Sequence, residues 1–213
     1  MGTKVSDSGG GGDFIPCPAG LHRAICVAYV DLGTQEGMKF NCPGETTWRQ
    51  QVVLMWETPD ETIEIDGESK PYIASKFYTK NLSPKANLTA DLESWRGRVF
   101  TDDERKGFDL DNILGVPCLI NVIHETKNNK TRAKVVNVLP LSKGMAKPEP
   151  SVKPWRYDVY EDFRNFPKGL TEGFKKMILK CREMSATSSN PTPEPTADDF
   201  PDLEPEDKSG IPF

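Results

Sequence analysis

Lysine, arginine and aromatic residues occur close together at three places in the chain. Cationic side chains hold phosphate groups and aromatic rings stack on bases, so a groove that combines them binds single-stranded nucleic acid. The densest basic cluster lies between the last two predicted strands. The candidate DNA-binding residues are Lys39, Phe40, Trp48, Arg49, Lys76, Tyr78, Lys80, Lys127, Lys130, Arg132 and Lys134.

The third predicted strand has two faces with different side chains. Lys76, Tyr78 and Lys80 share one face, which we expect to contact DNA, while Ile73 and Phe77 share the other and are expected to point into the core. Trp56 and Trp95 are also expected in the core, Trp95 because it continues an apolar helix stripe.

Residues for catalysis or for a metal site are scarce. The chain has only two histidines, His22 and His124, and no pair of cysteines with CxxC spacing. It has neither a P-loop nor a GxGxxG motif. We therefore expect no catalytic residues, no metal, no cofactor and no enzymatic activity, although a metal at Cys17 and Cys42 stays an open alternative.

The acidic charge of the chain is concentrated at its C-terminal end. Residues 185–213 hold seven acidic residues against one lysine, a net charge of −6, so the other 184 residues carry +1 of the chain's net −5. A nearly neutral body can still present a basic stripe to phosphates. The candidate partner-binding residues are Asp198, Asp199, Asp202, Glu204, Glu206, Asp207, Ile211, Pro212 and Phe213.

The order of predicted elements indicates an all-β core. Five strands are expected at residues 21–32, 50–57, 72–78, 118–124 and 133–139. The polar stretch at 33–44 predicts a loop or a short hairpin arm, and residues 125–132 predict a hairpin loop. Asp66-Gly67 predicts the turn of a hairpin between the second and third strands. A helix from an N-cap at Ser83 to Gly97, a capped turn at Thr101 and a short helical piece at 109–114 lie between strands three and four. This order predicts an OB-fold, a five-stranded barrel with a helix between its third and fourth strands.

Five segments are expected along the chain. They are a flexible leader (1–13), the OB-fold single-stranded DNA-binding domain (14–141), a linker (142–154), a helical extension (155–184) and a disordered acidic tail (185–213). The extension carries an apolar stripe, Leu170, Phe174, Met177, Ile178 and Cys181, that predicts docking on the barrel or on a second copy of the chain.

Two groups of residues carry a resemblance to a known family. The end Ile211-Pro212-Phe213 after acidic residues resembles the tail of bacterial and phage single-stranded DNA-binding proteins, although Lys208-Ser209-Gly210 separates the acids from Ile211 here. Residues 92–98, 108–110, 114–115 and 118 are similar to phage-encoded OB-type single-strand binders. The resemblance implies protection of single-stranded DNA in replication, recombination or repair, and recruitment of replication or repair proteins through the tail.

Other observations indicate the cellular compartment, and two alternative functions remain open. Five widely spaced cysteines, an odd number, indicate free thiols in a reducing cytoplasm, that of a bacterial host if a phage encodes the chain. No apolar run is long enough to span a membrane. Two alternatives remain: an adaptor that works through its tail without binding DNA, and a metal-dependent nuclease or strand-annealing protein.

Overall fold

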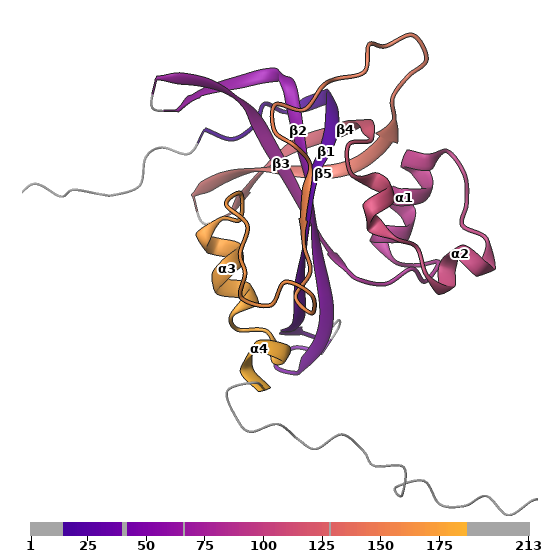
Figure 1. Cartoon of the computed structure of the whole chain (residues 1–213), viewed down its shortest axis with the longest axis vertical. Coiled ribbons are helices and arrows are strands. Elements are labelled where there is room, and N and C mark those ends of the chain that lie inside the picture. Colours follow the sequence, from indigo (N-terminus) through magenta and orange to yellow (C-terminus); the bar gives the residue numbers. More distant parts are fainter. Residues whose placement is uncertain (1–14, 40–41, 66, 128, 187–213) are drawn as a thin grey trace, which may run out of the picture.

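The computed structural model describes residues 15–39, 42–65, 67–127 and 129–186, and their core is a mostly antiparallel β-sheet (Figure 1). Five strands lie in the order β3-β2-β1-β4-β5, and a short sixth strand pairs with β1. The strands are β1 (Gly20–Met38), β2 (Thr46–Ile65), β3 (Glu68–Thr79), β4 (Pro117–Lys127), β5 (Lys130–Pro140) and β6 (Trp155–Tyr157). The expected all-β core is confirmed. Among the described residues β3 and β5 form the two ends of the sheet without a backbone ladder between them, so the sheet is open.

The central strand, β1, is buried on both faces. Ala24 and Cys26 belong to an apolar cluster shared with α1 (Asn87–Arg96), whereas Val30 and Leu32 belong to a second cluster shared with the C-terminal segment. Apolar residues therefore occupy both faces of the strand, which is the pattern of a sheet covered on both sides. Residues 24–32 of β1 are therefore shielded from water on both sides.

Of the two structures expected for residues 33–44, a hairpin arm is confirmed and a loop is wrong for most of the length. The first strand continues to Met38 and pairs with β2 from Thr46, so the two strands form a long arm. A register shift follows Asp31, and Gly33 has a φ of +70°, a value that favours glycine. The arm is polar because much of it faces water, and backbone hydrogen bonds hold a strand that hydrophobic periodicity cannot detect.

The two predicted hairpins differ in how closely they match. The β2–β3 hairpin is confirmed, with Ile65 opposite Glu68. The expected loop at 125–132 is wrong, because β4 and β5 remain paired as far as Lys127 and Lys130. Both faces of this end of the hairpin carry polar residues, so a hydrophobic pattern could not indicate that the strands continue here.

The helices between β3 and β4 lie on one side of the sheet (Figure 1). Ser83 is not the N-cap of α1, because residues 83–86 form a turn and the helix begins at Asn87, after the extended residue Ala86. Gly97 ends α1 in the left-handed conformation, as predicted. Thr101 caps α2 (Asp102–Lys106) in a reciprocal capping box with Glu104, and a 3-10 turn, η1 (Leu110–Ile113), follows.

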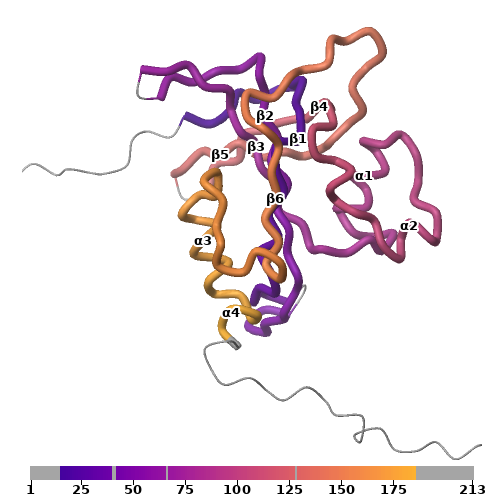
Figure 2. Tube along the Cα trace, viewed as in Figure 1, coloured from indigo at the N-terminus to yellow at the C-terminus, as the bar shows by residue number. Residues whose placement is uncertain are grey.

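The C-terminal extension covers the opposite face of the sheet. It begins with a strand and not with a helix, because Trp155–Tyr157 pairs in parallel with residues 28–30 of β1 (Figure 2). Two short helices follow, α3 (Glu172–Ile178) and α4 (Arg182–Ala186). Leu170, Ile178 and Cys181 are buried against β1 and β2, so docking on the sheet of the same chain is confirmed. No helix in the described part of the chain is long and apolar enough to cross a membrane.

Candidate nucleic-acid interface

The β4–β5 hairpin carries its basic residues on one face. Residues directly opposite each other in an antiparallel pair project to the same side of a sheet, and here the opposed pairs are Glu125 with Arg132, Lys127 with Lys130, and Ile123 with Lys134. The four basic residues of this hairpin that are predicted to contact DNA, Lys127, Lys130, Arg132 and Lys134, are exposed and share this face. Glu125 is the one acid among these six residues, and it pairs with Lys134 at 3.2 Å. The face therefore has a net charge of +3.

A large groove lies beside this basic face. It has a volume of about 1240 Å³ and is lined by residues of β3, of the β4–β5 hairpin and of the start of α3, among them Ile73, Phe77, Arg132, Lys134 and Thr171. Ile73 is 44% exposed and Phe77 is 50% exposed, which is high for side chains so apolar. The groove thus joins an exposed aromatic ring with two of the predicted DNA-binding cations.

The predicted orientation of β3 is wrong. Tyr78 is only 3% exposed and lies in the core, whereas Phe77 and Ile73 face outward. The polar hydroxyl of Tyr78 is satisfied inside the protein, because it donates a hydrogen bond to Asp91 of α1 at 2.7 Å. Burial and the neighbouring Asp91 carboxylate raise the pKa of Tyr78. Tyr78 therefore offers no stacking surface.

Lys76, like Tyr78, makes its polar contacts inside the protein. Its ammonium group donates to Asp91 at 2.5 Å and to the carbonyl of Val136, on β5, at 2.8 Å. Its side chain is 19% exposed, so the charge is used inside the protein and not on the surface. Lys76 lines the groove, but its contacts join β3, α1 and β5.

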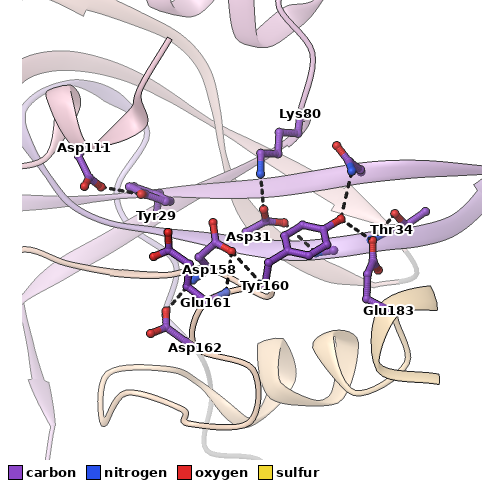
Figure 3. A network of polar contacts seen from close by, with 12 residues as sticks. Tyr29, Asp31, Thr34, Lys80, Asp111, Asp158, Tyr160, Glu161, Asp162 and Glu183 are labelled. Atoms are coloured by element: carbon purple, nitrogen blue, oxygen red, sulfur yellow. Dashed lines mark hydrogen bonds and ion pairs between the residues drawn. The ribbon is translucent and has the colours of Figure 1, made fainter. Parts of the chain in front are cut away.

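Lys80 belongs to a polar network at the far end of β3 (Figure 3). Its ammonium group lies 2.5 Å from the carboxylate of Asp31, which is 2% exposed, and 5.9 Å from the ring centre of Tyr160. A buried carboxylate needs a partner, so the charge of Lys80 is committed to Asp31. The hydroxyl of Tyr160 donates to Glu183 of α4 at 2.8 Å, which ties the C-terminal extension to the same network.

The remaining candidates lie on the β1–β2 arm, away from the groove. Lys39 pairs with Glu45 at 2.7 Å, while Trp48 is 47% exposed and Arg49 is exposed. The arm ends next to α4 (Figure 1). Phe40 and the partner-binding residues from Asp198 to Phe213 lie outside the described residues, as does the leader.

Phe77 and Ile73 are the groove residues that the sequence prediction missed as a contact surface. The alternation of β3 identified the two faces, but not which face is covered. Tyr72, which packs partly against the core, and the buried Ala74 show the same inward side as Tyr78. The sequence held no signal that this set of residues, and not Ile73 and Phe77, faces the core.

Histidines, cysteines and acids form no metal site in the described part of the chain, where no cluster of three or more such side chains has a metal-binding arrangement. The ring nitrogens of His22 and His124 lie 2.9 and 2.8 Å from the carbonyls of Pro18 and Cys17. The core positions expected for Trp56 and Trp95 are confirmed, at 0% and 6% exposed.

Comparisons with known proteins give no relative on which to base a function. No protein-family model matches the chain, and no curated protein matches it significantly.

Proposed function

We propose that this chain binds single-stranded DNA, with the basic face of the β4–β5 hairpin and the adjoining groove as its contact surface. The observation that carries the proposal is the shared groove of Phe77, Arg132 and Lys134. Phosphates bind the cations and a base stacks on the exposed ring of Phe77, each such stack contributing about 1–3 kcal/mol. Neither contact depends strongly on base identity, so binding is weakly sequence-dependent.

The proposal includes an OB-type barrel that is open between β3 and β5. The strand order and the position of α1 between β3 and β4 agree with this five-stranded, partly open barrel, which binds oligonucleotides across one face. The hydrogen bond from Lys76 to Val136 supports it, because it joins the two ends of the sheet across the gap.

The direct test compares two double variants of equal charge. Arg132→Gln with Lys134→Gln removes two cations of the groove, and Lys106→Gln with Lys143→Gln removes two exposed cations that do not line the groove. Fluorescence anisotropy with a labelled oligonucleotide of about 30 nucleotides measures binding. The groove variant should lose at least about ten-fold in affinity at low salt and the control should bind like the parent. Equal affinities for all three proteins would contradict the proposed site.

The second half of the proposal concerns the acidic C-terminal segment. We propose that residues 198–213 recruit replication or repair proteins through Ile211, Pro212 and Phe213, and that their acids compete with DNA for the basic groove. Deleting residues 198–213 should then raise DNA affinity at low salt. An affinity that does not change would exclude competition while leaving recruitment to be measured separately.

A further inference from the structure

The C-terminal extension contains a strongly basic stretch that the sequence prediction treated only as a docking helix. Residues 164–182 hold six basic residues and one acid, a net charge of +5. Arg164, Lys168, Lys176, Lys180 and Arg182 are exposed. Lys175 is the one basic residue of this stretch that forms an ion pair within the described residues, with Glu172 at 2.7 Å. The fold of the core does not require so many unpaired cations in 19 residues.

The start of α3, in the middle of this stretch, borders the groove. Thr171, at the start of α3, lines the groove together with Arg132 and Lys134. One turn further, the ring of Phe174 meets the exposed ring of Phe77 edge to face, with 5.9 Å between ring centres. The extension therefore forms a wall of the proposed binding surface.

The C-terminal end of α3 reaches the β1–β2 arm. The carbonyl of Met177 accepts a hydrogen bond from the side chain of Gln35 at 3.1 Å, and Gln35 is directly opposite Arg49 in the β1–β2 ladder. Arg49 is exposed and shares this face with Gln35, whereas Trp48 is opposite Glu36 and projects to the other face of the arm. In Figure 1, α3 runs from the β5 side of the molecule to the end where α4 and the arm meet. The basic stretch thus lies between the two surfaces that the sequence singled out.

We propose that residues 164–182 join the groove and the β1–β2 arm into one track for the backbone of a single strand. The inference rests on the proposed function and extends it, because it assigns phosphate contacts to Lys176 and Lys180 and makes Arg49 a distant phosphate contact of the same site. A strand that leaves Phe77 passes along α3 and reaches Arg49. Short strands fill only the groove, whereas long strands use the whole track.

The test uses two lengths of oligonucleotide with the full chain. The variant Lys176→Gln with Lys180→Gln is compared with the control Lys106→Gln with Lys143→Gln, in which the charge change is the same. With about 20 nucleotides, the α3 variant should bind more weakly, and the slope of log affinity against log salt should fall by about 1.4, about 0.7 for each lost phosphate contact. With about 6 nucleotides, within the range of a single OB site, the variant should bind like the parent.

A second variant tests the far end of the track. Arg49→Gln removes an exposed cation, so it should weaken binding of the longer oligonucleotide and lower its salt slope by about 0.7, with no effect on the shorter one. The track is overturned if the parent binds both lengths with salt dependence while the α3 variant and Arg49→Gln behave like the parent. A parent that binds neither length would instead contradict the proposed function.

Discussion

Lys127 and Lys130 face each other directly across the end of the β4–β5 hairpin. Like charges in opposed positions destabilise an antiparallel pair, by up to about 1 kcal/mol relative to a neutral pair. Two lysines at these positions therefore weaken the free protein, and a polyanion that binds between them removes the repulsion. This arrangement is typical of a surface whose sequence serves binding more than stability.

Replacing Lys130 with Glu separates these two effects. The substitution creates an opposed pair of unlike charges, so the free energy of unfolding in urea should rise by about 0.2–1 kcal/mol. The same change removes one phosphate contact and adds a negative charge, so affinity for single-stranded DNA should fall several-fold. A variant that is neither more stable nor weaker in binding would show that Lys130 lies outside the interface.

Lys76 and Lys134 should respond in opposite ways to the same substitution. Lys76→Gln leaves the partly buried Asp91 without its cation and should cost about 2–4 kcal/mol of stability, while the salt dependence of DNA binding stays the same. Lys134→Gln removes an exposed charge, so stability should change by less than about 1 kcal/mol and the salt slope should fall by about 0.7. Urea unfolding and anisotropy on both variants measure the two quantities. The reverse pattern would restore Lys76 as a DNA contact.

The fold was predictable from sequence where one face of an element is apolar and the turn is specific. Asp66-Gly67, Gly97 and Thr101 are local signals, and the structure bears out the β2–β3 hairpin, the end of α1 at Gly97 and the capping box at Thr101, while Asp66 itself lies outside the described residues. The length of the β1–β2 arm and the end of the β4–β5 hairpin were missed because polar residues on both faces give no period. Trp155–Tyr157 is too short for a pattern and is a strand only because the edge of β1 is free there.

The site was less predictable than the fold. The basic cluster at residues 127–134 was found from composition alone, and its common face follows from the register. Size and hydrophobicity could not show which of Tyr78 and Phe77 faces the core, since both are large aromatic residues. What decides it is the hydroxyl of Tyr78, which finds Asp91 in the interior, and the position of β3 at the end of the sheet.

Glu183 predicts how the extension responds to acid. Partial burial acts to raise the pKa of its carboxyl, but hydrogen bonds from the hydroxyl and N–H of Thr34, at 2.6 and 2.8 Å, and from Tyr160 outweigh it and lower the pKa to about 2. A carboxyl with a lowered pKa in the folded state stabilises the fold above its ordinary pKa of 4.5, and this contribution is lost as pH falls toward 2. Glu183→Gln should therefore be less stable at pH 7 and should show a flatter loss of stability between pH 4.5 and 2, measured by urea unfolding. Parallel curves for the two proteins would contradict this role.

Gly33 fixes the junction between β1 and the extension. A Cβ atom there would lie 2.8 Å from a carboxylate oxygen of Glu183 and 2.9 Å from the sulfur of Cys181, at a φ of +70°. Gly33→Ala should cost about 2–4 kcal/mol and make the extension easier to cleave by protease. Gly37→Ala is the control, because a Cβ there meets nothing within 4 Å, and it should leave stability unchanged or raise it by up to about 1 kcal/mol. Equal stabilities for both variants would show that the extension is not held at Gly33.

If cations of this chain bind the phosphates of a single strand, the affinity must depend on salt. Fluorescence anisotropy measures the affinity of the full chain for an oligonucleotide of about 30 nucleotides at several salt concentrations. We expect log affinity to fall linearly with log salt. The slope should be near −3 if the four cations of the β4–β5 face each bind one phosphate, at about −0.7 per contact, and steeper if α3 contributes. Absence of binding at low salt, or an affinity that does not depend on salt, would contradict phosphate binding by this chain.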